Sequence, residues 1–252
     1  MAKKPKKSVE ILSGIHSVTE ALRAGRREFF EIYFSRPLPE SIAGWARKRN
    51  VPVIGKSREE LGKLAGTDQH QHVAAKVTPF LPESLSRLIQ HDIAGKTSPL
   101  YVLLDSVEDP RNMGALIRTS VCGGVSGVIV PKDRCAPLTP AVSRASAGAM
   151  EHCRLCRVTN LTGAIKELKK QNVWITGLDR KGHLSIYDTD MTGACAIVVG
   201  GEHTGIRRLV AQNCDRLCHI PQYGPVNSLN ASVAGAIAIY EAIRQRSEEN
   251  HQ

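Results

Sequence analysis

The sequence predicts an α/β protein made of a small N-terminal α/β unit and a larger C-terminal domain built on a parallel sheet with flanking helices. From residue 100 onward, short apolar runs alternate with helical patterns. These runs are continuously apolar, as strands covered by helices on both faces usually are. Residues 9–78 show a second, shorter alternation of strand and helix patterns, and a proline-containing polar stretch separates the two parts.

The N-terminal unit begins with a helical pattern that places Val18, Ala21 and Leu22 on one face. Ser57 is followed three residues later by Glu60, the spacing of a capping box at a helix start. The expected helices span 14–26, 40–50 and 57–66, and the expected strands span 29–35, 51–55 and 72–77.

The C-terminal domain repeats a strand-then-helix pattern up to a long last helix. Its expected strands span 100–105, 127–131, 153–158, 173–179, 194–201 and 217–221. Its expected helices span 112–122, 139–149, 161–171, 204–213 and the stretch from about Leu229 to residue 246. The sequence therefore predicts a basic arm at 1–8, a small α/β domain at 9–78, a linker at 79–99 with a short helix at 83–90, a larger α/β domain at 100–246 and a tail at 247–252.

The balance of charge indicates a polyanionic partner. Lys and Arg total 34 against 24 Asp and Glu, which gives a formal net charge of +10. Nucleic acid is the usual partner of such a chain, although a basic surface without a specific ligand is the alternative. Aromatic residues make up only 4%, which argues against a base-stacking platform as the main grip on RNA.

The seven cysteines favour thiols over a disulfide framework, because an odd number cannot pair completely. Cys153 with Cys156, and Cys214 with Cys218, form two closely spaced pairs that could hold zinc. Their spacing fits poorly with known zinc patterns, so we expect no metal. No apolar run is long enough to span a membrane and no signal-peptide pattern opens the chain, so we expect a cytoplasmic protein.

Polar side chains gather where three of the predicted strands end. Asn112 and Arg118 follow the strand at 100–105, and Glu202 follows Gly200 and Gly201. The third cluster, after the strand at 217–221, contains Asn227, Ser228 and Asn230. Each residue has a structural explanation, since Ser and Asn cap helices and Gly-rich turns join strands to helices. Ligands of parallel sheets bind at the carboxyl ends of the strands, so the three clusters together predict a binding site.

A dinucleotide site fits these features less well. No G-x-G-x-x-G pattern follows the first strand of the domain, and the Gly-rich turn at 200–205 comes late in the chain. Glu202 would also face any phosphate placed at that turn, which disfavours a phosphate cradle.

The three strand-end segments resemble the three motifs of the SpoU family of RNA ribose 2′-O-methyltransferases. They read LLDSVEDPRNMGALIRTS, IVVGGEHTGI and IPQYGPVNSLNASVAGAIAIYEA. The segments GIHSVTEALRAG and GVIVPKDRCAPLTPAVSRASAGAMEHCRLCRVTNL resemble the branch that methylates a guanosine ribose in large-subunit (23S) ribosomal RNA. The resemblance covers nearly the whole chain and is strongest at 100–246. It departs at His72, where the family often has glycine in a tight turn that contacts RNA.

This resemblance implies a trefoil knot in the C-terminal domain, S-adenosylmethionine as cofactor, ribosomal RNA as substrate and a homodimer with a shared active site. It implies a ribosomal-protein-like RNA-binding domain at the N-terminus and no membrane association. By position in the motifs, the implied cofactor-binding residues are Gly200, Gly201, Ile220, Pro221 and Leu229.

The implied catalytic residues are Asn112, Arg118, Glu202, Ser228 and Asn230. The family picture makes Arg118 of one subunit the base in the other subunit's site. A guanidinium keeps its proton in proteins, so gripping a phosphate or stabilising alkoxide charge suits it better. Glu202 or a water relay are the other proton acceptors, and Asn112 would orient Arg118 or the ribose. The alternatives are a transfer RNA methyltransferase of the same family and a non-catalytic RNA-binding relative.

Overall fold

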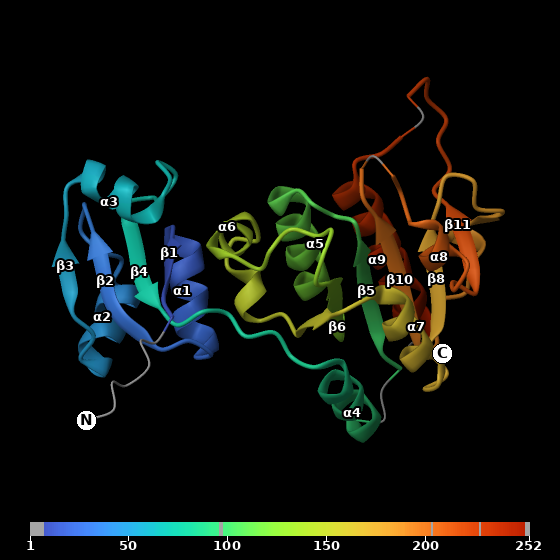
Figure 1. Cartoon of the computed structure of the whole chain (residues 1–252), viewed down its shortest axis with the longest axis horizontal. Coiled ribbons are helices and arrows are strands. Elements are labelled where there is room, and N and C mark those ends of the chain that lie inside the picture. The colour runs from blue at the N-terminus through green and yellow to red at the C-terminus, as the bar shows by residue number, and fades with distance from the viewer. Residues whose placement is uncertain (1–7, 96–97, 203, 227, 250–252) are drawn as a thin grey trace. The chain divides into compact units, whose positions relative to one another are not determined.

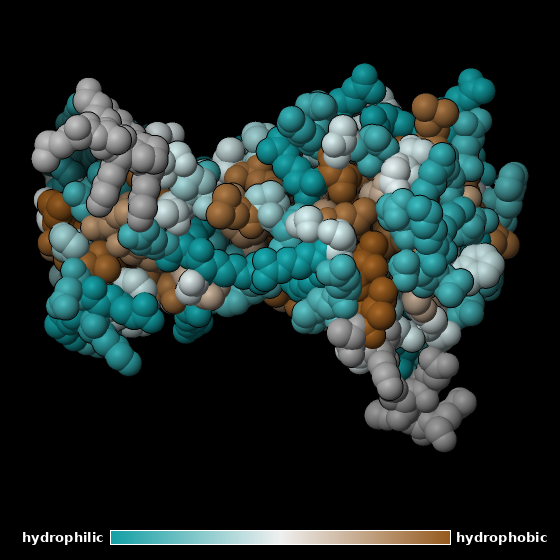
Figure 2. Space-filling view, turned by 60° about the horizontal axis from the view of Figure 1, so that its bottom comes forward, coloured by the Kyte–Doolittle hydropathy of each residue, from teal (hydrophilic) through white to brown (hydrophobic). Residues whose placement is uncertain are grey.

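The computed structural model describes residues 8–95, 98–202, 204–226 and 228–249, and the chain divides into two compact units (Figure 1). Unit 1 comprises Met1–Leu81 and Leu138–His152, and unit 2 comprises Pro82–Pro137 and Cys153–Gln252. On the face seen in Figure 2, hydrophilic residues cover most of each unit. No helix in the described ranges is both long and apolar enough to cross a membrane.

Unit 1 is a four-stranded mixed sheet with helices packed on it. The strands run in the order β1-β4-β2-β3, with β4 antiparallel to β1 and β2, and β2 parallel to β3. They span Glu10–Ser13 (β1), Phe29–Phe34 (β2), Val53–Gly55 (β3) and Val73–Val77 (β4), with helices Ile15–Ala24 (α1), Glu40–Arg49 (α2) and Arg58–Ala65 (α3). The predicted helices are confirmed, as is the capping box, in which the Ser57 hydroxyl and the Glu60 carboxylate each accept the other residue's backbone N–H.

A segment from the middle of the chain completes unit 1. It holds helix α6 (Pro140–Ala145) and a 3₁₀ turn, Ala149–Glu151. The fully buried Glu151 carboxylate accepts two bonds from Arg27, each 2.9 Å, and one of 3.1 Å from Ser143. The sequence predicts one helix over 139–149, but α6 ends at Ala145. Ala147 and Gly148 have φ values of 51° and 82°, which no right-handed helix accommodates.

Unit 2 contains a seven-stranded sheet in the order β7-β6-β5-β10-β8-β11-β9, with every neighbouring pair parallel. The predicted parallel sheet is therefore confirmed. Strands β5, β6 and β10 are buried along their whole length, as their continuous apolar sequences predict. The strands span Leu100–Asp105 (β5), Gly127–Pro131 (β6), Leu155–Val158 (β7), Trp174–Leu178 (β8), Leu184–Ser185 (β9), Cys195–Gly200 (β10) and Arg216–His219 (β11).

Two helices of unit 2 differ from the prediction. Helix α4 (Leu85–Gly95) is longer than the expected 83–90 and lies inside the stretch predicted as a linker, with Leu88 buried in the core of the sheet. Helix α8 (Arg208–Ala211) is shorter than the expected 204–213, because the preceding turn pairs Gly201 with Gly205. The remaining helices are α5 (Pro110–Cys122), α7 (Leu161–Lys169) and α9 (Ala231–Glu249).

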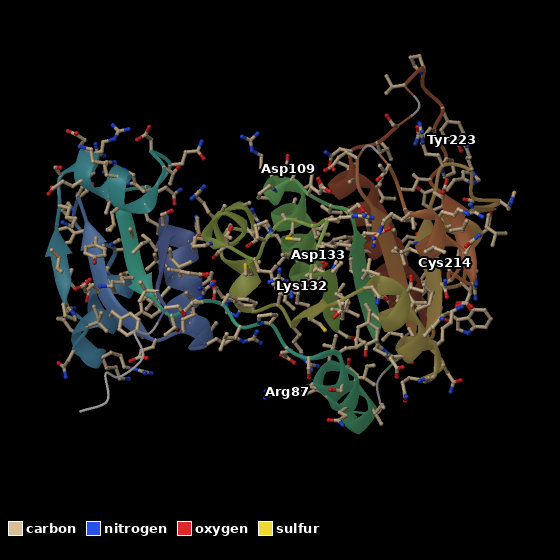
Figure 3. All side chains as sticks on the ribbon, in the orientation of Figure 1. Arg87, Asp109, Lys132, Asp133, Cys214 and Tyr223 are labelled. Carbon is tan, nitrogen blue, oxygen red and sulfur yellow. The ribbon has the colours of Figure 1, made fainter. Side chains whose placement is uncertain are left out.

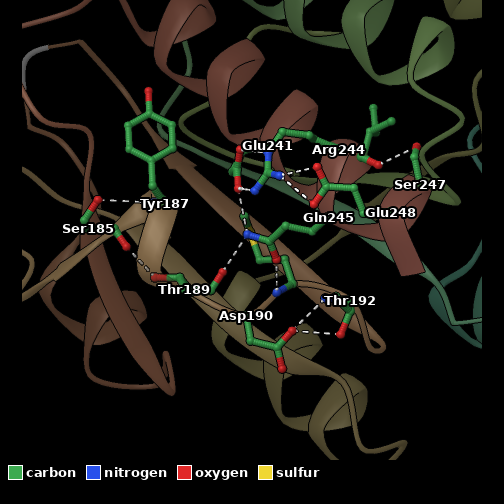
Figure 4. A network of polar contacts seen from close by, with 12 residues as sticks. Ser185, Tyr187, Thr189, Asp190, Thr192, Glu241, Arg244, Gln245, Ser247 and Glu248 are labelled. Atoms are coloured by element: carbon green, nitrogen blue, oxygen red, sulfur yellow. Dashed lines mark hydrogen bonds and ion pairs between the residues drawn. The ribbon is translucent and has the colours of Figure 1, made fainter. Parts of the chain in front are cut away.

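The last helix, α9, packs on α5 and β10. A side chain at Gly235 would lie 2.3 Å from Leu116 Cδ2, so the absence of one permits this close approach. Farther along, Gln245 donates to the Thr189 carbonyl (3.0 Å) and accepts from the Met191 amide (2.8 Å), within the network of Figure 4. Between β11 and α9 the chain crosses back toward β10. Whether that crossing threads a trefoil knot stays a prediction.

Candidate active site

The second and third strand-end segments line a cavity of about 490 Å³ at the carboxyl edge of the unit 2 sheet, and the first segment joins them there through hydrogen bonds of Asn112 to Glu202 and Asn230. This volume lies within the range of small-molecule and cofactor sites. Four of the five residues predicted to bind a cofactor line the cavity, while Pro221 is half-buried beside it and does not. Those four are Gly200, Gly201, Ile220 and Leu229.

The glycines of this edge let two backbone segments touch. A Cβ on Gly200 would lie 2.2 Å from the carbonyl carbon of Gly205, and one on Gly201 would lie 2.0 Å from the carbonyl oxygen of Ser106. Neither position has room for a side chain, so the cavity has a wall of bare backbone there. Backbone amides and carbonyls on such a wall can hydrogen-bond a flat ligand without steric hindrance.

A buried ion pair holds this wall in place. Asp105, at the end of β5, is fully buried and accepts bonds from the backbone amide and the Nε of Arg207, at 2.8 and 2.7 Å. The pair ties the β10–α8 turn to β5, and breaking it would leave an uncompensated buried carboxylate. The motif analysis missed both residues. The signal that could have revealed them is a carboxylate ending an otherwise apolar strand.

Three predicted catalytic residues form one chain of hydrogen bonds. The Oδ1 of Asn230 accepts the amides of Ser232 (2.9 Å) and Val233 (3.3 Å) at the start of α9. This leaves the Asn230 amide group to donate, and it bonds Asn112 Oδ1 at 3.0 Å. Asn112 Nδ2 in turn donates to Glu202 Oε1. The helix cap therefore sets the direction of both amides: Asn230 donates to Asn112, and Asn112 donates to the carboxylate.

The other residues of the third motif occupy distinct positions. Ser228 is exposed and lines the cavity. Asn227 lies outside the described residues. Leu229 precedes α9, which begins two residues later than the sequence predicts because Asn230 caps it.

Arg118 lies apart from its own chain's cavity. It is exposed on α5 and is not among the residues that line the cavity. It stands six positions after Asn112, a rotation of about 240° around the helix, so the two side chains leave different faces. Within the described ranges, Arg118 makes no hydrogen bond or ion pair. Its charge is therefore available to a partner that this single chain does not supply.

The end of β8 and the loop after it supply cavity residues that the motif analysis missed. Leu178, Asp179, Arg180 and Lys181 all line the cavity. The Asp179 amide donates to the Cys218 carbonyl (2.9 Å), and its carboxylate accepts the Lys181 amide (2.8 Å). Ligands of parallel sheets bind at the carboxyl ends of the strands, and 173–179 is a predicted strand, so the sequence could have revealed these residues too.

The cysteines do not form a metal centre within the described ranges, where no group of three or more metal-ligating side chains lies together. All seven are free thiols. Burial raises the pKa of Cys218, which lines the cavity, to about 12. This thiol stays protonated near neutral pH and is unsuited to act as a nucleophile.

Comparison with known proteins agrees with this geometry. Residues 99–240, more than half of the chain, match the SpoU rRNA Methylase family. The chain belongs to this family. Residues 11–82 match a second family, described as RNA 2′-O ribose methyltransferase substrate binding.

Relatives named as methyltransferases align along nearly the whole chain. A protein of Vibrio vulnificus named 23S rRNA (guanosine-2′-O-)-methyltransferase RlmB is 38% identical over 251 residues, which cover 95% of this chain and 98% of the relative. The protein of the same name from Escherichia coli K12 is 36% identical and covers 94% and 99%.

Solved structures show the same fold. The SpoU methyltransferase AviRb from Streptomyces viridochromogenes, in complex with AdoMet, superposes with a TM-score of 0.81 at 23% identity, covering 98% of this chain and 95% of that one. The TrmH/SpoU tRNA modifying enzyme of A. aeolicus gives a TM-score of 0.56 at 28% identity and covers 66% of this chain and 84% of its own.

Proposed function

We propose that this protein transfers the methyl group of S-adenosylmethionine to the ribose 2′-hydroxyl of a guanosine in 23S ribosomal RNA. The observation that carries the proposal is the cavity at the carboxyl edge of the sheet, where all three motif segments converge on one bare-backbone wall and one hydrogen-bonded polar chain. The relatives that align along 94–95% of this chain bear the name of that activity. The net charge of +10 suits an RNA substrate.

The lining of the cavity fits the proposed cofactor. Ile220 and Leu229 supply apolar surface for an adenine ring, and the wall at Gly200 and Gly201 supplies backbone groups within reach of it. Asp179 and Glu202 also line the cavity, and their carboxylates suit the positive groups of a sulfonium amino acid. S-adenosylmethionine, when bound there, supplies an activated methyl group.

The residues of the chain position the attacking hydroxyl and take up its proton. Glu202 is the carboxylate at the end of the Asn230–Asn112 hydrogen-bond chain. We propose that it accepts the proton of the ribose 2′-hydroxyl, directly or through water. Asn112 holds that carboxylate in a fixed orientation. Ser228, exposed on the cavity wall, is placed to bond the ribose. Holding the nucleophile in line is itself a large part of the rate acceleration.

We further propose a cytoplasmic homodimer in which Arg118 of one subunit completes the site of the other. Its exposure, its lack of a bonding partner in the described part of the chain and its absence from its own cavity support this arrangement. As a cation, Arg118 would bind the nucleotide phosphate and stabilise alkoxide charge.

The test combines calorimetry with methyl transfer. We expect S-adenosylmethionine to bind the protein, and labelled methyl to appear on one guanosine of a 23S ribosomal RNA transcript and not on transfer RNA. Transfer to transfer RNA alone would assign the enzyme to that substrate, and cofactor binding without transfer to either RNA would contradict the proposal. No cofactor binding would make the chain a non-catalytic RNA-binding relative.

The shared site has its own test. Arg118→Ala subunits mixed with Asn230→Ala subunits should regain activity, because a heterodimer restores one intact site. No recovery after confirmed subunit exchange would place Arg118 in its own subunit's site or in none.

A further inference from the structure

The loop between β11 and α9 carries an aromatic ring with almost no cover. Tyr223 is 97% exposed and Val226 is 71% exposed. In Figure 3, Tyr223 lies on the loop that extends beyond the carboxyl edge of the sheet. A single exposed apolar residue needs no explanation, so its position relative to the cavity decides whether the ring has a role.

The residues on either side of this ring belong to the cavity. Gln222 immediately before it lines the cavity, and so do Ser228 and Leu229 after it. The loop thus begins and ends at the cavity wall and presents Tyr223 at its outer part. A molecule bound in the cavity would therefore lie close to this segment.

The other strongly exposed aromatic residues of unit 2 do not lie beside the cavity as Tyr223 does. Trp174 lies at the start of β8, the opposite edge of the sheet, and its ring is covered by the Arg216 guanidinium at 4.7 Å. Tyr187 and Tyr240 are each 52% exposed, and neither they nor their sequence neighbours line the cavity. Among the described aromatic residues of unit 2, only Tyr223 is almost fully exposed and also lies next to residues that line the cavity.

The charges around the cavity indicate what the ring would contact. The described residues from Ile220 to Val226 carry no charged side chain, whereas Arg180 and Lys181 line the same cavity from the β8–β9 loop. With Asp179 beside them, Arg180 and Lys181 leave that loop with a net positive charge, and a basic side with a neutral aromatic side matches the phosphates and the bases of a single RNA strand. Unstacked bases of single-stranded RNA characteristically stack on exposed aromatic rings.

We propose that Tyr223 stacks on a nucleobase of the substrate RNA, at or next to the methylated nucleotide, and so positions the ribose 2′-hydroxyl at the cavity. The inference rests on the proposed function and adds a positioning residue for its substrate. Stacking uses the ring and not the hydroxyl, which makes phenylalanine an adequate replacement and alanine a poor one. The reaction itself and the binding of S-adenosylmethionine do not involve this ring.

The test compares Tyr223→Ala and Tyr223→Phe with Tyr187→Ala, an exposed tyrosine of the same unit away from the cavity. We expect Tyr223→Ala to raise the KM for a 23S ribosomal RNA fragment about tenfold, the factor given by a weak base–aromatic stack. Tyr223→Phe and Tyr187→Ala should stay within about twofold, and all three should bind S-adenosylmethionine as the wild type does. A fragment with 2-aminopurine beside the target should lose fluorescence on binding to the wild type and to Tyr223→Phe, but not to Tyr223→Ala.

Several results would overturn the inference. An unchanged KM and unchanged fluorescence loss in Tyr223→Ala would mean that the ring does not contact RNA, and equal defects in the Ala and Phe variants would assign the effect to the hydroxyl. Weaker cofactor binding in Tyr223→Ala would show that the ring covers its own cavity, and a change of oligomeric state would show that it covers a second copy. Methyl transfer by the wild type in the same assay reports separately on the proposed function.

Discussion

The two edges of the unit 2 sheet carry cavities of opposite character. The cavity at the carboxyl edge, of about 490 Å³, is lined by exposed polar side chains such as Glu202 and Ser228. The one at the amino edge, of about 130 Å³, is lined largely by apolar residues around Tyr101 and Asp92. Tyr101 donates to Asp92 at 2.5 Å, and both are buried.

This difference indicates how one sheet separates stability from function. At the amino edge the polar groups are buried and satisfy each other, so removing one should weaken the fold. At the carboxyl edge Asp105 is buried against Arg207, but the side chains of the Asn230–Asn112–Glu202 chain are exposed or half-buried and are held in orientation by a helix cap, so removing one of these should reduce activity with less effect on the fold. The following changes test this division, from the largest expected effect to the smallest.

Gly200→Ala should abolish the cofactor site. Its Cβ would lie 2.2 Å from the Gly205 backbone, so the wall of the cavity has to move. We expect affinity for S-adenosylmethionine, measured by calorimetry, to fall at least about 100-fold, or about 2.7 kcal/mol. Gly193→Ala is the matched control, because a Cβ there meets nothing within 4 Å. Equal affinities in the two variants would contradict the role of the bare-backbone wall.

Asn230→Asp should separate capping from catalysis. The aspartate keeps an oxygen for the Ser232 and Val233 amides but cannot donate to Asn112. We expect the rate of methyl transfer to fall at least about tenfold, or about 1.4 kcal/mol of barrier, with the melting temperature nearly unchanged. Asn230→Ala should lose the same activity and also about 1 kcal/mol of stability, because the cap is gone. Wild-type activity in Asn230→Asp would remove the hydrogen-bond chain from the mechanism.

Tyr101→Phe should weaken the fold and spare the reaction. It removes the donor to Asp92, whose other oxygen still accepts from Arg154 at 3.2 Å. We expect the free energy of unfolding to fall by about 1–3 kcal/mol in denaturant titrations, with kcat unchanged. A lower kcat in the folded variant would contradict the proposal that the amino edge serves stability and the carboxyl edge serves activity.

Buried thiols should make the protein less stable in alkali. Burial raises the pKa of Cys156 and of Cys218 to about 12 from an ordinary value near 9. Above pH 9 the unfolded chain loses these protons while the folded one keeps them, so stability should decline between about pH 9 and 12. Cys218→Ala should flatten this decline in unfolding measurements, whereas Cys122→Ala, at an exposed thiol, should not. If the unfolding free energy falls with pH equally steeply in both variants, the buried Cys218 thiol is not a cause of the decline.

Much of the fold could be predicted from the sequence because its causes are local. The apolar runs at 100–105 and 194–200 correspond to buried strands, and the Ser57–Glu60 spacing to a capping box. Parallel strands place their carboxyl ends at one edge, so Glu202, Ser228 and Asn230 could be expected near each other. Each of these expectations needs only the spacing of residues along the chain.

Only the tertiary structure decided the features that depend on distant segments. It shortened α8, joined 138–152 to unit 1 through Arg27 and Glu151, and paired the buried Asp105 with Arg207. It also linked Asn230 to Glu202 through Asn112 and left Arg118 outside its own cavity. Such features arise where segments far apart in sequence come within bonding distance, and residue spacing carries no information about which segments will meet.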